Sequence, residues 1–227
     1  MGFRIVLLGA PGAGKGTQAQ RIAASRAIPH VSTGDIFRDH LQRNSDLARE
    51  IEPYMESGSL VPDELTCAIV ARRLSESDCS HGYVLDGFPR SLEQAETLES
   101  LLGQRAEKLD VAFDLEVSDK EIVERLTARR MCPVCGAIYN LKYDPPRESE
   151  DRCSRNGCAG TLIRRPDDTA ETIRQRLAIF HETTEPIRKF YDERGILRTV
   201  VADNLMPEAV FVKFESILNA MQAARRS

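Results

Sequence analysis

Tryptophan is absent from this sequence, and Phe and Tyr together make up only 6% of the chain. Long apolar runs are absent too, since none approaches the roughly 18 to 20 residues that a membrane-spanning helix needs. The apolar run at 5–8 is also too short for the core of a signal peptide, and it leads directly into a glycine-rich loop. We therefore expect no membrane partner and a cytoplasmic location.

An excess of positive charge is also missing, because 31 Lys and Arg stand against 35 Asp and Glu, a net charge of −4. General nucleic-acid binders are usually basic overall, so nucleic acid is not an expected partner. The six cysteines come without an export signal, which indicates a reducing compartment. In that setting paired cysteines suggest a metal site before they suggest a disulfide.

Short apolar runs alternate with helical stretches along most of the chain. The runs at 3–8, 82–85, 111–115 and 197–201 predict buried strands, and a helix is expected over about 15–25. This alternation predicts an α/β fold with a parallel sheet that helices flank on both faces. The segment 131–165 breaks the alternation, because it has four cysteines and few apolar residues, and it resembles an inserted miniature domain.

Helices are predicted on both sides of this insertion. Ser118 with Glu121, and Asp168 with Glu171, have the three-residue spacing of capping boxes. In a capping box each side chain binds a backbone N–H of the first helical turn. We therefore expect both pairs to begin helices in this way.

A glycine-rich loop, Gly9-Ala10-Pro11-Gly12-Ala13-Gly14-Lys15, joins the first predicted strand to the first predicted helix. This is the context of a phosphate-binding loop, in which backbone N–H groups and the helix N-terminus hold phosphate oxygens and the lysine adds a cation. The general pattern has Ser or Thr directly after the lysine as a magnesium ligand. Here Gly16 intervenes before Thr17, so direct contact of Thr17 with the metal is not expected.

A second group of polar residues follows the strand predicted at 82–85. Asp86 stands at the strand end, the position from which phosphate-loop enzymes reach the magnesium shell. Arg90 can hold a phosphate through two hydrogen bonds. Gln94 can read the edge of a base with a donor and an acceptor.

Four cysteines form two pairs, Cys132-x2-Cys135 and Cys153-x4-Cys158, inside the insertion. These spacings suit a structural Zn²⁺ site, because four thiolates fill the tetrahedron and leave no open position for catalysis. A segment of this size cannot stabilise itself with an apolar core alone. A disulfide pair or free thiols are the alternatives.

The chain resembles the adenylate kinases, nucleoside monophosphate kinases, in their long-lid form with a four-cysteine zinc lid. The resemblance is carried by Gly-x-Pro-Gly-x-Gly-Lys-Gly-Thr, Ser32-Thr33-Gly34-Asp35 with Arg38, Ser59-Leu60-Val61-Pro62-Asp63, and Leu85-Asp86-Gly87-Phe88-Pro89-Arg90 with Gln94. Zinc-lid members mostly have two residues between the second pair of cysteines, so the four-residue gap here is a departure.

The resemblance implies the residues of the site. The catalytic residues would be Lys15, Asp86, Arg90, Arg129, Arg165 and Arg176. The ATP-binding residues would be Gly12, Ala13, Gly14, Lys15, Gly16, Thr17, Arg125, Ile138, Tyr139 and Met206. The AMP-binding residues would be Thr33, Arg38, Ser59, Leu60, Val61, Gly87, Phe88, Pro89, Arg90, Gln94, Arg165 and Arg176. For Ile138 and Tyr139, simple packing of a lid hairpin is an equal alternative.

The resemblance also implies the architecture and the reaction. Residues 1–31, 62–127 and 166–227 would form the core, 32–61 a mobile AMP-binding segment, and 128–165 a mobile lid with the zinc site. The reaction would be Mg·ATP + AMP ⇌ 2 ADP, with Mg²⁺ and a structural Zn²⁺ as cofactors, and a monomer is the family expectation. The Phe88–Pro89 bond is expected to be cis.

Two other functions are weighed against this one. A kinase for UMP or CMP would share the fold, but Thr33, Gln94 and the long lid argue against it. A zinc-ribbon binding module on an inactive phosphate-loop domain would have a degraded Gly-Lys loop and aromatic residues among the cysteines. The loop is intact, and Tyr139 and Tyr143 are the only aromatic residues in the insertion.

Overall fold

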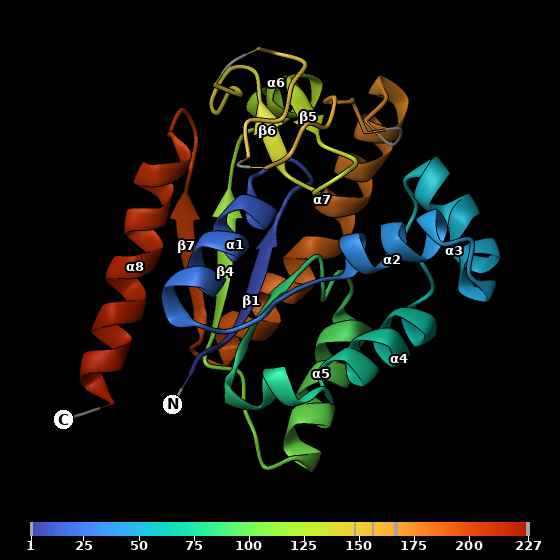
Figure 1. The fold of residues 1–227 in the computed structure, drawn as a ribbon. Coiled ribbons are helices and arrows are strands. Elements are labelled where there is room, and N and C mark those ends of the chain that lie inside the picture. Colours follow the sequence, from blue (N-terminus) through green and yellow to red (C-terminus); the bar gives the residue numbers. More distant parts are fainter. Residues whose placement is uncertain (1, 148, 156, 166–167, 226–227) are drawn as a thin grey trace.

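A five-stranded parallel sheet with the strand order β2-β3-β1-β4-β7 forms the centre of the molecule (Figure 1). The computed structural model describes residues 2–147, 149–155, 157–165 and 168–225. The strands are β1 (Arg4–Gly9), β2 (His30–Ser32), β3 (Tyr83–Asp86), β4 (Val111–Glu116) and β7 (Leu197–Val201). The predicted α/β fold with a parallel sheet is therefore confirmed, and four of the five strands were expected from the sequence. The three-residue β2 was too short to stand out as an apolar run.

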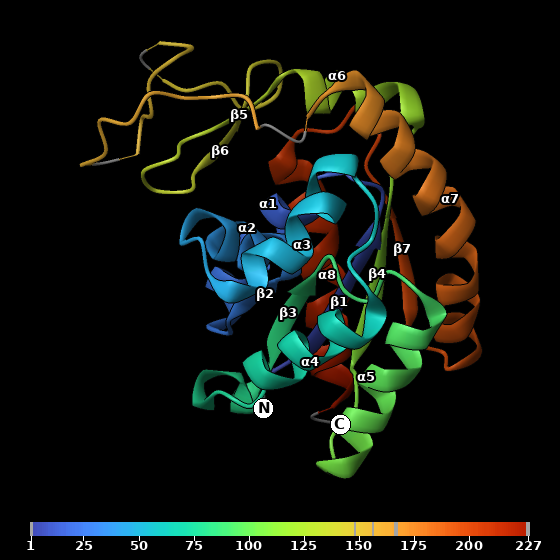
Figure 2. The ribbon, with the colours of Figure 1, turned by 90° about the vertical axis from the view of Figure 1, so that its right-hand side faces the viewer.

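Helices cover both faces of this sheet (Figures 1 and 2). On one face lie α1 (Lys15–Arg26) and α8 (Pro207–Ala224), which contact each other. On the other face α5 (Leu92–Gln104) contacts both α4 (Asp63–Arg73) and α7 (Ala170–Glu193). A short 3₁₀ helix, η1 (Ser77–His81), precedes β3, and α6 (Asp119–Thr127) follows β4.

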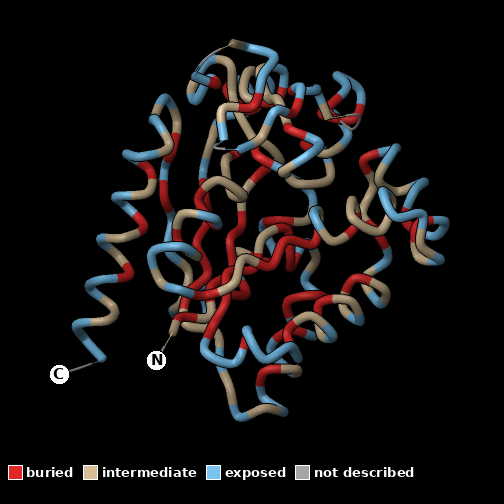
Figure 3. The backbone as a smooth tube through the Cα atoms, viewed as in Figure 1, coloured by how far each residue is buried: buried red, intermediate tan, exposed pale blue. Residues whose placement is uncertain are grey.

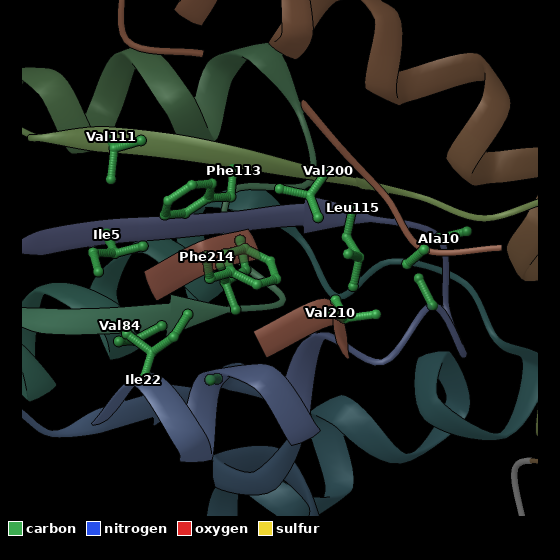
Figure 4. Packing of buried hydrophobic residues seen from close by; sticks show 14 of the residues in the cluster. Ile5, Ala10, Ile22, Val84, Val111, Phe113, Leu115, Val200, Val210 and Phe214 are labelled. Atoms are coloured by element: carbon green, nitrogen blue, oxygen red, sulfur yellow. The ribbon is translucent and has the colours of Figure 1, made fainter. Parts of the chain in front are cut away.

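Two apolar cores follow from the alternation of side chains along the strands. Ile5 and Leu7 of β1 join the core beneath α1 and α8, whereas Val6 and Leu8 join the core beneath α4, α5 and α7. In the first core the rings of Phe113 and Phe214 meet edge to face, with centroids 4.7 Å apart (Figure 4). Buried residues accordingly concentrate along the strands, and exposed residues on the outer sides of the helices (Figure 3).

Two segments lie beside these layers and have small cores of their own. Helices α2 (Thr33–Gln42) and α3 (Asp46–Ser57) pack together around Phe37, Ile51 and Val61. Strands β5 (Arg129–Met131) and β6 (Ile138–Asn140) form a separate antiparallel pair. The loops that follow them carry the cysteines and extend away from the main body (Figure 2). The predicted return to the core at 166 falls on residues 166–167, outside the described part of the chain.

The capping boxes predicted for the helices beside this insertion are wrong, although both helices exist. The Ser118 hydroxyl donates to Asp203 (2.9 Å), and Glu121 binds Arg125 and the Asn204 N–H. Helix α7 is capped by Thr169, whose hydroxyl oxygen accepts from the Thr172 N–H (3.1 Å). The Glu121 carboxylate thus binds an arginine one turn along its own helix and a distant backbone N–H in place of the helix end.

Among the described residues, no helix is long and apolar enough to cross a membrane.

Candidate active site

The glycine loop between β1 and α1 has a backbone that only glycine accommodates easily. Gly12 has φ of +86°, and a Cβ there would lie 2.6 Å from Cγ of Leu126. Gly14 caps α1 with φ of +104°, and apart from its chain neighbours the nearest atoms to a Cβ there would be on Arg125 and Leu115, 3.9 Å away. Within the described chain no side chain caps α1, and its first turn contains no acidic residue. The helix therefore presents its N–H groups and positive dipole end to an open space suited to an anion.

Lys15 is the first residue of α1, and its ammonium group is turned back over the loop. Its Nζ donates to the carbonyl oxygens of Gly9 (2.7 Å) and Ala10 (2.9 Å). Burial lowers the pKa of Lys15 to about 8, although the nearby charge of Asp86 acts in the opposite direction. The loop thus holds a poorly solvated cation that an anionic ligand would stabilise.

Asp86 ends β3 next to this lysine, as the sequence predicted. Burial acts to raise the pKa of its carboxyl, but the hydrogen bond from His30 (Nε2 to Oδ2, 3.3 Å) and the charge of Lys15 outweigh burial and lower the pKa overall. A Cβ at Gly16 would lie 3.3 Å from Oδ2 of Asp86, so the carboxylate lies directly against the loop. An ionised carboxylate at this place suits the shell of a magnesium ion.

Arginines surround the same space from several elements. Nε of Arg90 donates to the Gly87 carbonyl oxygen (2.9 Å), and Arg38 pairs with Asp35 (2.5 Å). Arg125 pairs with Glu121 and also donates to the carbonyl oxygens of Ala13 (2.9 Å) and Ala202 (2.7 Å). The site therefore concentrates positive charge, as the binding of polyphosphates requires.

A cleft of about 770 Å³ brings most of the predicted site residues together. Those lining it are Gly12, Ala13, Gly14, Lys15, Gly16, Thr17, Thr33, Arg38, Ser59, Leu60, Val61, Asp86, Gly87, Arg90, Gln94, Arg125, Arg129, Ile138, Tyr139, Arg165 and Arg176. The four arginines predicted near the phosphates, from α6, β5, the insertion exit and α7, thus face one cavity. The volume lies within the usual range for ligand sites, roughly 300 to 1,000 Å³.

Three predicted residues do not line this cleft. The Phe88 side chain is buried in the core beneath α5, and Pro89, joined to it by a cis peptide bond, lines a smaller adjoining cavity of about 70 Å³. Met206 is half exposed just before α8, while its neighbours Leu205 and Pro207 reach the cleft. Arg130 and Arg164 also stay outside the cleft and donate to the carbonyl oxygen of Thr127.

Tyr143 and Asn140 are among the further residues that line the cleft although the sequence left them without a role. The Tyr143 ring lies 5.3 Å from the Arg125 guanidinium, and the Asn140 amide donates to the Arg125 carbonyl oxygen (3.0 Å). Both belong to the insertion, where local patterns predict little because the contacts are long-range. An aromatic residue in a polar, cysteine-rich segment was the one available signal.

The four cysteines of the insertion form a compact cluster. Their sulfur atoms all lie within 4.8 Å of one another, with Cys132 and Cys158 at 3.6 Å and Cys135 and Cys153 at 3.6 Å. Thiolates about 2.3 Å from a tetrahedral zinc ion would be about 3.8 Å apart, so the donor set fits the metal. All six cysteines of the chain are free thiols. The cluster could therefore bind zinc, and the four-residue gap between Cys153 and Cys158 does not prevent it.

Tyr139 connects this cluster to the cleft. Its hydroxyl lies 3.3 Å from Sγ of Cys153 and accepts a hydrogen bond from the Ser154 N–H (3.0 Å). The hydroxyl holds the pKa of the Cys153 thiol well below its ordinary value, at about 6. The hydroxyl of Tyr139 thus faces the cysteines, while the residue also lines the cleft.

The fold and the cleft define a class. A phosphate loop between a parallel strand and a helix, with arginines converging on it from inserted segments, is the arrangement of an α/β phosphate-loop kinase.

Comparison with known proteins narrows the class. Residues 7–196 match the family model described as adenylate kinase. A curated adenylate kinase from Agathobacter rectalis is 46% identical over 95% of this chain and 99% of its own length. Those from Moorella thermoacetica and Symbiobacterium thermophilum are 45% and 43% identical, over 92% and 98% of this chain and 94% and 100% of their own lengths. The chain belongs to the adenylate kinase family, an enzyme family of nucleotide phosphoryl transfer. The prediction that this chain is an enzyme is thus confirmed, and the alternative of a binding module on an inactive domain is not supported.

Proposed function

We propose that the enzyme transfers the γ-phosphoryl group of Mg·ATP reversibly to AMP, which gives two ADP and balances the adenine nucleotides. The observation that supports this most directly is the single cleft in which the phosphate loop and the predicted AMP-binding residues Thr33, Arg38, Arg90 and Gln94 occur together. A cleft that bound only the phosphate donor ATP would not need this second group of residues. The coexistence of both groups favours two nucleotides held at once.

The chemistry needs no general base. A phosphomonoester has a second pKa of about 6, so the AMP phosphate is largely a dianion at neutral pH and can attack directly. Its oxygen forms a bond to the γ-phosphorus while the bond from that phosphorus to the β–γ bridging oxygen breaks, and the electron pair stays on the new ADP. The protein must hold two mutually repelling anions in line and stabilise the charge that spreads over the transferred group.

Each predicted catalytic residue has a role in that scheme. Lys15 and the N–H groups of the loop would hold the ATP phosphates, and Arg38 and Arg90 the phosphate of AMP. Arg129, Arg165 and Arg176 would bind the group in transfer. Magnesium bound with ATP supplies neutralisation of phosphate charge, and Asp86 is the carboxylate suited to its shell.

Closure of the cleft is the second requirement, because water in the site would hydrolyse ATP. We propose that 32–61 and 128–165 are the segments that close, around a core of 1–31, 62–127 and 166–227. Their separate small cores allow each to move as a unit. We also propose a structural Zn²⁺ held by the four cysteines, a monomeric state and a cytoplasmic location.

The test is ADP formation from Mg·ATP with AMP, GMP, CMP or UMP as the acceptor. An acceptor-free reaction and the Lys15→Met variant are the controls. Strong preference for AMP is the expected result. If CMP or UMP were turned over as fast as AMP, AMP could not be assigned as the specific substrate. If no acceptor received a phosphoryl group, the proposal would be overturned.

A further inference from the structure

A carboxylate outside the cleft binds the side chain that we expect to read the acceptor base. Gln94, on the first turn of α5, lines the cleft and is only 2% exposed. Its Nε2 donates to Oδ1 of Asp63 (2.6 Å), while its Oε1 accepts from the Arg90 N–H (2.7 Å). Asp63 does not line the cleft and lies behind Gln94.

Asp63 is itself held in place. The Ser91 hydroxyl donates to its second oxygen, and the same hydroxyl oxygen accepts from the Gln94 N–H (3.1 Å) as the cap of α5. Asp63 is also the first residue of α4, and only Pro62 separates it from the segment 32–61. Ser91 and Asp63 thus form a bridge between two helix N-termini, with the Gln94 amide at its centre.

The chemistry of these partners permits only one orientation of the amide. An ionised carboxylate can only accept and a backbone N–H can only donate, so exchange of Oε1 and Nε2 would create two unfavourable contacts at once. A buried polar group left without a partner is costly. Gln94 therefore keeps its Nε2 toward Asp63 and its Oε1 toward Arg90.

This orientation leaves one Nε2 hydrogen and one Oε1 lone pair for a base in the cleft. A 6-aminopurine offers a ring-nitrogen acceptor beside an amino donor, which matches that pair. A 6-oxopurine has an N–H donor beside an oxygen acceptor, so both contacts would be reversed. We propose that Asp63 is a positioning residue, which locks the Gln94 amide and thereby selects 6-aminopurine over 6-oxopurine nucleotides as phosphoryl acceptors. This inference rests on the proposed function.

The variant Asp63→Asn tests it, with AMP and IMP as acceptors that differ at this purine edge. An asparagine side chain can either accept from Nε2 or donate to Oε1 of Gln94, so only the Arg90 N–H would still favour the original orientation. We expect the ratio of kcat/KM for AMP over IMP to fall about tenfold, in keeping with the loss of one buried hydrogen-bond constraint. The change should come from a higher KM for AMP, with kcat and the KM for ATP nearly unchanged.

The matched control is Glu64→Gln, which removes the same charge from the first turn of α4 at an exposed position. It should keep the wild-type AMP to IMP ratio. An unchanged ratio in Asp63→Asn, or an equal loss in Glu64→Gln, would overturn the proposal.

A measurement on the unsubstituted protein keeps the inference testable if Asp63→Asn does not fold. The NMR signals of the Gln94 side-chain amide, assigned by their loss in Gln94→Glu, should include one Nε2 proton that exchanges slowly with water. Rapid exchange of both protons would overturn the proposed lock. If the wild-type protein transfers no phosphate to AMP, the proposed function fails, whereas slow exchange would still show that Asp63 holds Gln94.

Discussion

Arg129 and Asp168 face each other across the entrance and the exit of the cysteine-rich insertion. Nε of Arg129 donates to Oδ2 of Asp168 (2.8 Å), and a second hydrogen bond joins the other carboxylate oxygen. The Asp168 side chain is fully buried, with 0% exposure, and that of Arg129 is 17% exposed. This pair closes the base of the insertion and orients a predicted catalytic arginine, so stability and activity both depend on it.

The variant Asp168→Ala should therefore lower both the stability and the activity of the enzyme. We expect the free energy of unfolding to fall by about 2–3 kcal/mol, since removal of one partner leaves a largely buried charge without its counterion. The kcat should fall as well, because Arg129 loses its orientation. Urea denaturation and steady-state kinetics measure the two effects. The control is Glu171→Ala, an exposed acidic residue in the first turn of α7. An Asp168→Ala variant as stable as this control would contradict the assigned role.

The lowered pKa of Lys15 predicts how ATP binding depends on pH. In the free protein the ammonium loses its proton as the pH rises through about 8, whereas bound polyphosphate would raise that pKa. Between the two pKa values, affinity for ATP should fall by up to about tenfold per pH unit, and binding should take up a proton. Calorimetry between pH 7 and 9.5, in buffers of different ionisation enthalpy, measures both quantities. Lys15→Met should lose this dependence, and a constant Kd in the unsubstituted protein would refute the prediction.

Removal of one cysteine should affect stability before chemistry. The variant Cys132→Ser breaks a four-thiolate set that lies outside the cleft, so zinc content and melting temperature should both fall while the reaction survives at low temperature. Elemental analysis, a melting curve and a low-temperature assay measure these three outcomes. Cys67→Ser, which changes a thiol outside the cluster, should retain the metal. Loss of activity with an unchanged melting curve would argue against a structural ion.

Two glycines with different surroundings should respond oppositely to alanine. Gly12→Ala places a Cβ against Leu126 at a positive φ, and we expect a loss of stability of about 2–3 kcal/mol together with weaker ATP binding. Gly103→Ala lies in α5, where a Cβ would meet no described atom within 4 Å beyond its chain neighbours and the backbone of its own helix. It should be neutral or stabilising by up to about 1 kcal/mol. Thermal unfolding with and without ATP compares them, and equal melting temperatures for the two variants would contradict this account.

Local patterns in the sequence determined much of this protein. The glycine loop, the four longer strands and the cysteine spacing are read from neighbouring residues, because turns, apolar runs and metal knuckles depend on short-range geometry. Most residues that the family resemblance then assigned to the site line the cleft. Lys15, Asp86 and the converging arginines lie together in one space, and their roles stay predictions.

Only the tertiary structure decided which partner each charged or amide side chain chose. Local spacing assigned Glu121 and Asp168 to helix ends, yet Arg125, Asn204 and Arg129 bind them. Nothing in the spacing of Asp63 and Gln94 suggests that they are bonded across 31 positions. A carboxylate pairs with whichever donor folding brings to it in a buried place, where an unpaired polar group is costly, so competition across the whole chain settles these contacts.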